Sequence, residues 1–363
     1  MTVFSGMQIG LIGPLPPPAG GMANQTRQLA ELLRAEEATV WLVQTNAPYR
    51  PAWVSRLRGV RAVFRLAVYV QALWRAAGRS DLFHVMANSG WSWHLFAAPA
   101  IWIGRLRRVP VVVNYRGGEA AEFLTRSHRL VGMSINRAAR LIVPSGFLRQ
   151  VFGRFGIAAD EVPNIVDLDR FKPGDSRSAG GPQLVVARNL EPLYDNSSAI
   201  RALAIVRKTH PNATLVIAGT GPDEARLKNL TASLGLQDKV RFVGRLDRDA
   251  MAELYRASHC ALNPSLADNM PNSILEAMAS GLPVVSTNVG GVPFIVEHEK
   301  SALLVPPGDA QAMADAVSRV LEQPALAERL SQAGLREAQR YAWSEIRPIL
   351  ARVYGDLTDA RSA

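Results

Sequence analysis

Residues 268–285 read DNMPNSILEAMASGLPVV, a polar loop that leads into a short helix and then into an apolar strand. The pattern predicts a helix over residues 272–279, ended by Gly281 and Pro283, with a buried strand after it. The first turn of a helix carries N–H groups without intrahelical partners and the positive end of the helix dipole. A diphosphate would therefore bind well at this turn. The candidate donors are the backbone N–H groups of Asn272, Ser273 and Ile274.

Two carboxylates flank the start of this helix. Asp268 lies in the loop before it and Glu276 lies one turn inside it. Both side chains can therefore face one ligand from two heights. From spacing alone a second interpretation stays open, in which Asp268 is an ordinary loop residue and Glu276 a solvated helix position.

Strands and helices alternate along the rest of the chain, which indicates βαβ units and parallel sheets. Strands are expected at 7–12, 39–43, 82–86, 110–114, 141–144, 183–187, 213–218, 239–243, 260–262, 283–286 and 302–305. Helices are expected at 24–33, 197–208, 223–234, 249–257, 272–279, 309–321 and 344–357. The polar segment 174–182 is the candidate linker. It separates an expected first domain, 1–173, from a second, 174–342.

Composition points to a globular protein. The 363 residues suffice for two domains of roughly 100–200 residues each. No apolar run reaches the roughly 18 residues that cross a bilayer, so no membrane span is expected. The first basic residue after Met1 is Arg27, so the charged n-region of a secretory signal is missing and no such signal is expected. Cys260 is the single cysteine and the six histidines are scattered, which indicates a reducing cytoplasm and no His/Cys metal site.

Positive charge is concentrated in the first half of the chain. Residues 1–173 carry 21 Lys and Arg against 10 Asp and Glu, a net +11, whereas residues 174–363 carry 20 against 21. The first half is therefore expected to contact an anionic substrate or membrane surface, and no nucleic-acid partner is expected.

A helix expected between residues 53 and 79 has a basic stripe and an apolar stripe. The basic stripe consists of Arg58, Arg61 and Arg65, and the apolar stripe of Val60, Phe64, Ala67, Val70 and Trp74. Two interpretations stay open: a packed helix with a solvated basic face, or a site for a membrane surface or an anionic acceptor. Trp91, Trp93 and Trp102 are either core residues or the entry for a lipid acceptor.

Other local motifs have competing explanations. Gly20 and Gly21, between a strand and a helix, form either a tight turn or a close approach of the backbone to phosphates. Gly219-x-Gly221 begins a dinucleotide fingerprint, but its third glycine is replaced by Glu224. The D-x-D triplets at 167–169 and 247–249 are expected to cap or to be solvated rather than to bind a metal.

Several motifs resemble, in the same order, those of the retaining family 4 glycosyltransferases over residues 7–345. The stretch at 268–276 is similar to the family's E-x7-E signature, with Asp268 in place of the first Glu. The other matches are the Gly20-Gly21 loop, Asp81-Leu-Phe-His84, Val162-Pro-Asn164-Ile-Val-Asp167 with Phe171, Ala187-Arg188-Asn-Leu190-Glu-Pro192, Ala218-Gly-Thr-Gly221-Pro-Asp-Glu224, Val240-Arg-Phe-Val-Gly244 and Asn288-Val-Gly290-Gly291.

The resemblance implies an α/β fold of two Rossmann-like domains that face each other across a cleft, with the final helix, in 343–363, packed back on the first domain. It implies transfer of a hexosyl group from a UDP- or GDP-linked sugar, without a metal or another cofactor. The second domain would bind the donor and the first the acceptor, a saccharide or a lipid-linked saccharide of surface-polysaccharide synthesis. The protein would be cytoplasmic, or peripheral on the inner face of the membrane.

The resemblance also implies roles for single residues. Arg188 would stabilise the leaving diphosphate, Glu276 would accept hydrogen bonds from the ribose, and Asp268 would hold the sugar hydroxyls. The glycines near the donor would be Gly20, Gly21, Gly219, Gly221 and Gly244.

Two departures from the family pattern bear on the chemistry. The family's phosphate-binding lysine is absent, because residues 193–195 read Leu-Tyr-Asp, so Arg188 is expected to carry more of the diphosphate charge, with help from Lys208 or Arg245. Arg116 stands where the family has a histidine, and it is the remaining catalytic candidate. A nucleotide-sugar epimerase or hydrolase of related fold, or a non-catalytic membrane scaffold, stays open as an alternative.

Overall fold

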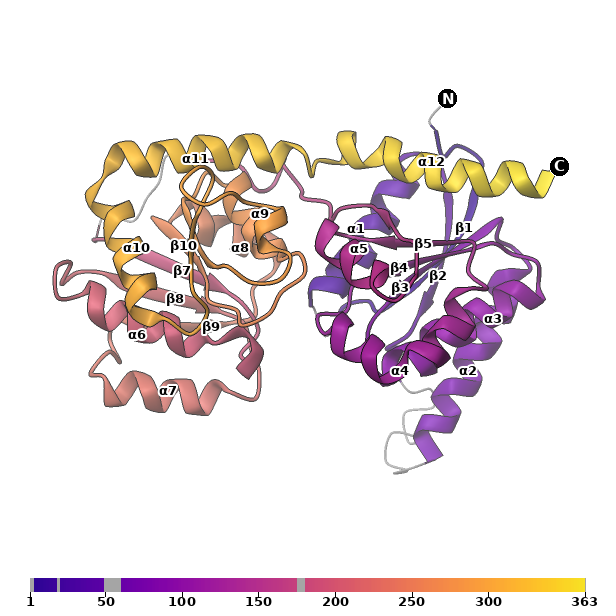
Figure 1. Cartoon of the computed structure of the whole chain (residues 1–363), viewed down its shortest axis with the longest axis horizontal. Helices are drawn as coiled ribbons and strands as arrows, with labels where there is room; N and C mark the ends of the chain where they lie inside the picture. The colour runs from indigo at the N-terminus through magenta and orange to yellow at the C-terminus, as the bar shows by residue number, and fades with distance from the viewer. Residues whose placement is uncertain (1–2, 18–19, 49–59, 175–179, 363) are drawn as a thin grey trace. The chain divides into compact units, whose positions relative to one another are not determined.

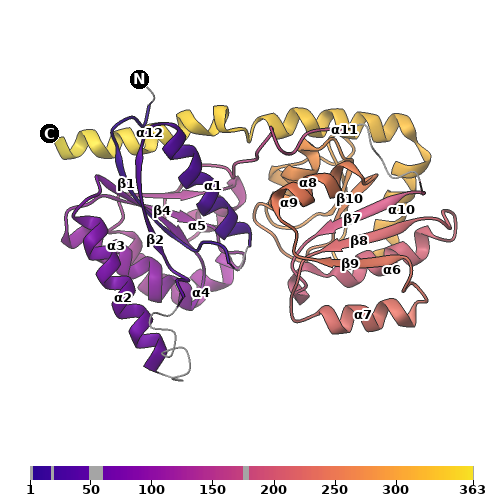
Figure 2. The ribbon, with the colours of Figure 1, turned by 180° about the vertical axis from the view of Figure 1, so that it is seen from behind.

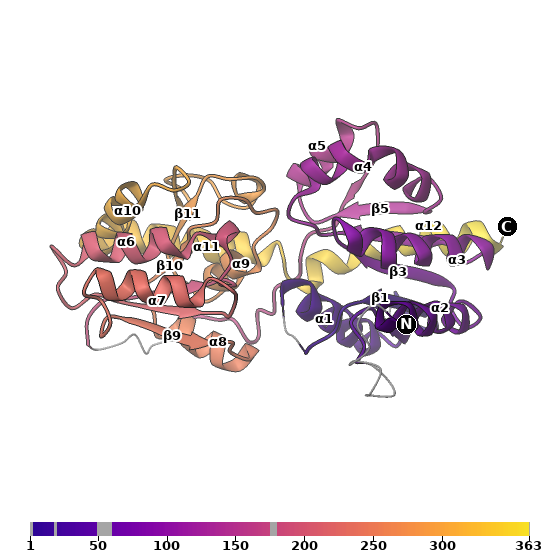
Figure 3. The ribbon, with the colours of Figure 1, turned by 90° about the horizontal axis from the view of Figure 1, so that it is seen from below.

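The computed structural model describes residues 3–17, 20–48, 60–174 and 180–362 (Figure 1). The chain forms two compact units. Unit 1 comprises residues 1–164 with 346–363, and unit 2 comprises residues 165–345. Each unit contains one six-stranded sheet in which all strands are parallel, as the alternation of strands and helices predicts. Helices cover both faces of each sheet (Figure 3).

The sheet of unit 1 has the strand order β2-β1-β3-β4-β5-β6. Its strands are β1 (Gln8–Gly13), β2 (Thr39–Gln44), β3 (Leu82–Ala87), β4 (Val111–Tyr115), β5 (Arg140–Val143) and β6 (Asp160–Glu161). Its helices are α1 (Gly21–Ala35), α2 (Val60–Ala77), the π-helical turn η2 (Trp93–Ala97), α3 (Ala98–Leu106), α4 (Ala120–Ile135), α5 (Gly146–Gly153) and most of α12 (Trp343–Ser362).

Side chains alternate between the two faces of this sheet because the pleat has a period of two residues. Phe83 and Val85 on β3 face a core built with α2, α3, α4 and α5. His84, between them, faces the opposite side and contacts Tyr354 of α12. The last helix therefore packs on the sheet of unit 1.

The sheet of unit 2 has the strand order β12-β11-β10-β7-β8-β9, of which Figure 2 labels β10, β7, β8 and β9. Its strands are β7 (Gln183–Ala187), β8 (Thr214–Ala218), β9 (Val240–Gly244), β10 (Cys260–Asn263), β11 (Val284–Thr287) and β12 (Leu303–Val305). Its helices are α6 (Asn196–Val206), α7 (Glu224–Ser233), α8 (Arg248–Arg256), α9 (Asn272–Ala279), α10 (Ala310–Glu322) and α11 (Pro324–Gln339), with short 3₁₀ turns η3 (Pro192–Tyr194) and η4 (Val292–Phe294).

The boundary between the units lies after Asn164, nine residues before the expected position at 173. Val166 and Phe171 are buried in a core of unit 2, together with side chains of α8 and α9. The N–H of Val166 donates to the carbonyl of Tyr341 at 2.9 Å, which also fixes this segment within unit 2. The candidate linker overlaps residues 175–179, which lie outside the described residues.

The apolar stripe named from the sequence is not the face of α2 that packs. Phe64, Val70 and Trp74, from the apolar stripe, are between 38% and 44% exposed. The buried positions are Tyr69, Leu73, Ala76 and Ala77, a different stripe of the same helix. Of the basic stripe, Arg58 and the side chain of Arg61 lie outside the described residues. Trp93 is buried in the core, whereas Trp91 and Trp102 are 78% and 42% exposed.

Candidate functional site

In unit 2 the order of the strands reverses between β7 and β10. From β7 the chain moves outward through β8 and β9, and it then returns to the other side of β7 to form β10. In open parallel sheets such a switch point leaves a crevice at the carboxyl ends of the strands, where ligands bind. Arg188 directly follows β7, and Ser265 and Asp268 follow β10, so all three residues lie at this edge.

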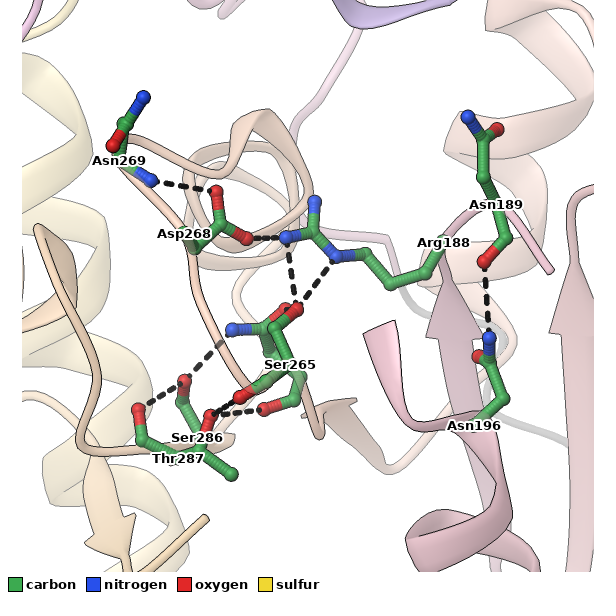
Figure 4. A network of polar contacts seen from close by, with 9 residues as sticks. Arg188, Asn189, Asn196, Ser265, Asp268, Asn269, Ser286 and Thr287 are labelled. Atoms are coloured by element: carbon green, nitrogen blue, oxygen red, sulfur yellow. Dashed lines mark hydrogen bonds and ion pairs between the residues drawn. The ribbon is translucent and has the colours of Figure 1, made fainter. Parts of the chain in front are cut away.

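A chain of hydrogen bonds holds Arg188 at this edge (Figure 4). Its Nε and one terminal nitrogen donate to the Ser265 hydroxyl at 3.1 and 3.0 Å. Ser265 donates to Asn263 Oδ1 at 3.1 Å, and Asn263 Nδ2 donates to the Ser286 hydroxyl at 2.9 Å. Because these residues come from three adjacent strands, β7, β10 and β11, the sheet itself positions the guanidinium.

Arg188 also forms an ion pair with Asp268 (Figure 4). No local sequence pattern predicts this contact, because the two residues are 80 positions apart. Both side chains are largely buried, at 11% and 12% exposure. Asp268 additionally accepts a hydrogen bond from the N–H of Asn269 at 3.0 Å. The carboxylate expected to hold sugar hydroxyls therefore neutralises the main cation of the site in this structure.

Tyr194 occupies the region where the family pattern has its lysine. It lies in η3, and the guanidinium carbon of Arg188 stands 4.5 Å from the centre of its ring, a cation–π contact. The next residue, Asp195, has a left-handed backbone and accepts hydrogen bonds from the hydroxyls of Ser197 and Ser198 at the start of α6. The segment thus orients Arg188 and begins a helix, and it adds no cation.

Three glycines let the loops that carry Arg188 and Asp268 pack closely. A Cβ on Gly219 would lie 2.0 Å from the carbonyl oxygen of Arg188, and one on Gly221 would lie 2.2 Å from that of Leu190. A Cβ on Gly290 would lie 2.1 Å from the carbonyl oxygen of Asp268. Gly219 and Gly221 were expected to bind the donor. Their close packing against the backbone of residues 188–190 is by itself enough to require glycine at both positions. Gly244 ends β9 with φ +68°, a backbone conformation that favours glycine.

Glu276 lies on α9 beside Tyr255, whose hydroxyl donates to its Oε2 at 3.4 Å. Burial raises the pKa of Glu276 to about 7, although the positive charges of Arg248 and Arg188 and the Tyr255 hydrogen bond act in the opposite direction. The Glu276 side chain is therefore half-buried and hydrogen-bonded to Tyr255, and it is not a freely solvated helix position. A carboxyl that changes its charge near neutral pH is typical of functional sites.

Helix α9 begins at Asn272, as predicted. Of the three backbone N–H groups expected to bind the diphosphate, one already has a partner. The N–H of Ile274 donates to the carbonyl of Pro271 at 3.1 Å and is therefore already used. Pro271, at the N-cap, provides no side-chain cap. The Ser273 hydroxyl oxygen is buried and has no hydrogen-bond partner among the described residues. Such a group costs free energy unless a ligand satisfies it.

In unit 1 the other candidates occupy the corresponding edge of the sheet. Gly20 precedes α1 with extended backbone, and a Cβ there would meet no atom within 4 Å, so the turn itself does not require glycine. Gly21 is the first residue of α1. Arg116 directly follows β4, and its guanidinium donates to Asn114 and Asn164.

The remaining sequence candidates are structural or distant. Asp247 caps α8 by accepting from the N–H of Ala250 at 2.9 Å, and Asp167 pairs with Arg248 at 3.1 Å. Lys208 follows the C-terminal end of α6, whereas Arg188 lies near the N-terminal end of that helix. The described part of the chain contains no group of three His, Cys, Asp or Glu side chains suited to a metal ion. It also contains no helix long and apolar enough to cross a membrane.

Sequence reasoning missed Tyr194, Ser265 and Tyr255. Tyr194 replaces an expected lysine. An aromatic residue close in sequence to a candidate phosphate-binding arginine could have predicted their cation–π contact. The other two carry no local signal, because their contacts depend on the order of the strands.

Sequence comparison covers nearly the whole chain. The family model described as Glycosyltransferase Family 4 matches residues 19–170, and that described as Glycosyl transferases group 1 matches residues 170–337. A phosphatidyl-myo-inositol mannosyltransferase of Mycobacterium leprae is 28% identical over 380 residues, 96% of each chain. A D-inositol 3-phosphate glycosyltransferase of Saccharomonospora viridis is 32% identical over 241 residues, 61% of this chain, and the match spans only 56% of that relative.

Solved structures share the fold. The sucrose-phosphate synthase of Thermosynechococcus elongatus superposes with a TM-score of 0.77 at 23% identity, covering 97% of this chain and 100% of that one. The Anabaena protein Alr3699/HepE, solved in complex with UDP, superposes with a TM-score of 0.75 at 20% identity, covering 96% and 100%. The family models, the relatives and the two parallel sheets agree with the motif order, and the chain belongs to the family 4 glycosyltransferases.

Proposed function

We propose that this protein transfers a hexosyl group from a UDP- or GDP-linked sugar to a saccharide or lipid-linked acceptor, with retention at the anomeric carbon and without a metal ion. The observation that carries the proposal is the position of Arg188. Arg188 is a cation held from three strands at the switch point of unit 2, and its charge acts on Glu276 of α9. At the start of the same helix, the buried Ser273 hydroxyl has no partner among the described residues. These groups are suited to a diphosphate.

The chemistry follows from where charge develops. As the bond between sugar and diphosphate breaks, negative charge accumulates on the leaving group, and fixed cations and donors stabilise it best. Arg188 and the Ser273 hydroxyl supply that stabilisation in the proposal. Glu276, one turn further along α9, accepts hydrogen bonds from the ribose. The complexes of Alr3699/HepE with UDP and with UDP-glucose support a nucleotide-sugar donor.

The contact with Arg188 gives Asp268 a second role beside binding the sugar. The free site pairs the carboxylate with the cation. An arriving diphosphate competes with Asp268 for Arg188, and the released carboxylate can then accept hydrogen bonds from the sugar. Asp268 thus links binding of the diphosphate to binding of the sugar.

A thermal-shift experiment tests the donor part of the proposal. A ligand that binds only the folded state at about 100 times its Kd stabilises that state by about 2.7 kcal/mol. We expect one of the UDP- or GDP-hexoses to raise Tm by several degrees in the wild type and by much less in Arg188→Gln. Arg201→Gln, on α6, is the matched control and should behave as the wild type. No shift with any donor would contradict the proposal.

The acceptor side of the proposal rests on an exposed apolar surface of unit 1. It is formed by α2, η2, α3 and α4, and we call it the tryptophan surface. Its most exposed members are Val63, Trp91, Leu106 and Leu130, each more than 60% exposed. The guanidinium of Arg107 stacks on Trp74 at 4.7 Å, and that of Arg137 stacks on Trp102 at 4.3 Å. Tryptophan and cationic side chains together are typical of a surface at the lipid–water interface.

Vesicle sedimentation tests this surface. Basic residues near an anionic membrane contribute about 1 kcal/mol each, so binding should increase with phosphatidylserine content and decrease with salt. Trp102→Ser with Leu106→Ser should weaken binding to phosphatidylserine vesicles. The control is Leu234→Ser in unit 2, which removes an apolar side chain that is 36% exposed, close to the 42% of Trp102. Equal sedimentation of both variants and the wild type would refute a membrane contact here.

A further inference from the structure

A buried chain of hydrogen bonds in unit 1 connects the C-terminal helix α12 with Arg116. His84 on β3 is fully buried, and its Nδ1 lies 2.7 Å from the hydroxyl of Tyr354 on α12. Its Nε2 lies 3.0 Å from Nδ2 of Asn114 on β4. Asn114 Oδ1 accepts from Nε of Arg116 at 3.1 Å. His84 and Asn114 share a face of the sheet because His84 pairs with Val112 in the parallel register.

The direction of every hydrogen bond in this chain follows from Arg116. A guanidinium only donates, so Asn114 must present its carbonyl oxygen to Arg116 and its NH₂ group to His84. Nε2 of His84 must then accept, and it carries no proton. Burial, aided by the charge of Arg116, lowers the pKa of His84 to about 3, so the ring is neutral at pH 7. Its single proton is therefore on Nδ1 and is donated to the oxygen of Tyr354.

Arg116 is held by more than this chain. One terminal nitrogen of its guanidinium donates to Asn164 Oδ1, and its backbone N–H donates to the carbonyl of Ala87 at 2.9 Å. Burial lowers the pKa of Arg116 to about 10, so the side chain is a cation at neutral pH. Asn164 is the last residue of unit 1 before the chain enters unit 2, and α12 begins in unit 2. Arg116 is thereby held by the last residue of unit 1 before the chain enters unit 2 and, through Asn114 and His84, by α12.

We propose that Tyr354, His84 and Asn114 are positioning residues that fix the guanidinium of Arg116 for the transfer reaction. The proposal rests on the proposed function and on the expectation from the sequence that Arg116 is a catalytic residue of unit 1. Its physical basis is that the chain has one consistent set of proton positions. If the Tyr354 oxygen is removed, the favoured proton position on His84 moves to Nε2, Asn114 must rotate its amide, and a donor then faces Nε of Arg116.

Nitrogen NMR of arginine- and histidine-labelled protein tests the positioning without relying on activity. The Arg116 Nε–H signal is identified by its loss in Arg116→Lys. In Tyr354→Phe we expect its hydrogen exchange to become on the order of tenfold faster, and the His84 proton to move from Nδ1 to Nε2. The matched control is Tyr69→Phe, which removes a buried hydroxyl bonded to the Phe96 carbonyl at 2.8 Å in the same unit. An unchanged Arg116 signal, or an equal change in the control, overturns the proposal.

A second variant tests the direction of the chain and does not depend on how Tyr354→Phe folds. Asn114→Asp presents oxygen to both neighbours, so it should move the His84 proton to Nε2 while the Arg116 Nε–H stays protected. If the wild type already carries the His84 proton on Nε2, so that Asn114→Asp changes nothing, the assigned direction is wrong and the proposal fails.

Activity then separates this proposal from the proposed function. With a donor and acceptor that the wild type uses, Tyr354→Phe should lower kcat/KM on the order of tenfold, as a misplaced binding group does. Tyr69→Phe should retain wild-type activity. If Arg116→Gln transfers sugar as fast as the wild type, the positioning role is overturned while the transferase assignment stands. If the wild type transfers no sugar, the proposed function itself fails.

Discussion

Replacing Glu276 by alanine should weaken donor binding in a way that depends on pH. The side chain accepts hydrogen bonds from the ribose in the proposed complex, and a hydrogen bond to a charged group contributes about 1.5–3 kcal/mol. At about 1.4 kcal/mol per factor of ten, the loss is roughly 10- to 150-fold in Kd. This full effect is expected at pH 8, where the carboxyl is ionised.

The pKa of Glu276 sets the pH dependence. Because burial raises this pKa to about 7, roughly one tenth of the carboxyls are ionised at pH 6 and nine tenths at pH 8. If only the ionised form binds, the apparent Kd of the wild type should fall about tenfold between pH 6 and pH 8. Glu276→Ala and Glu276→Gln should both show a flat profile. A nucleotide sugar is the right probe, because its diphosphate does not titrate in this range.

Calorimetric titration at pH 6, 7 and 8 provides the measurement, and thermal unfolding provides the control. A carboxyl whose folded pKa lies above its unfolded value binds more protons in the folded state between pH 4.5 and 7. It therefore destabilises the fold as pH rises through that window. Glu276→Gln should thus raise Tm at pH 8 while it weakens binding. A pH-independent wild type, or normal binding by Glu276→Ala at pH 8, would refute the assignment.

Three further predictions follow from the same contacts. Asp268→Asn removes the carboxylate that competes with the diphosphate for Arg188. Free UDP or GDP should therefore bind the variant on the order of tenfold more tightly than the wild type, because the competing partner was a hydrogen-bonded charge. Weaker binding in calorimetry would contradict this prediction. His84, with its pKa lowered to about 3, binds no proton in the folded state between pH 3 and 6.5 while the unfolded chain does. In urea unfolding of the wild type, the free energy of unfolding should therefore decrease by about 1.4 kcal/mol for each unit by which pH is lowered below 6. His84→Gln should show a smaller decrease, and a variant profile identical to that of the wild type would disprove the prediction. Exhaustive chelation should leave sugar transfer unchanged, because Arg188 and the start of α9 supply the positive charge; loss of turnover restored by Mg²⁺ would show otherwise.

The regular elements around the site were predictable from local pattern. The helix at 272–279 and the strands at 183–187 and 260–262 were expected within a residue of their observed bounds, because caps, Gly and Pro end them sharply. Helix α11 was missed, although Pro324 at its first turn is a usual helix-start signal. The buried face of α2 could not be predicted from the sequence because two apolar stripes fit the same helical period, and only the packing against α3 and the sheet selects one.

The contacts inside the site were not predictable in the same way. The pairing of Arg188 with Asp268 requires β7 and β10 to be neighbours, and strand order is a property of the whole unit. The same holds for the chain from Tyr354 to Arg116, which joins residues 270 positions apart at its first step. Motifs selected the candidate residues, whereas the topology determined which of them meet.

The most direct test of the proposed transfer follows the sugar and the nucleotide together. The protein is incubated with a labelled UDP- or GDP-hexose and a lipid-linked saccharide extract, and the products are separated and examined by proton NMR. We predict that each nucleoside diphosphate released is matched by one hexose joined to the acceptor with the anomeric configuration of the donor. Free hexose alone, or an epimerised sugar still attached to its nucleotide, would contradict the assignment as a retaining transferase.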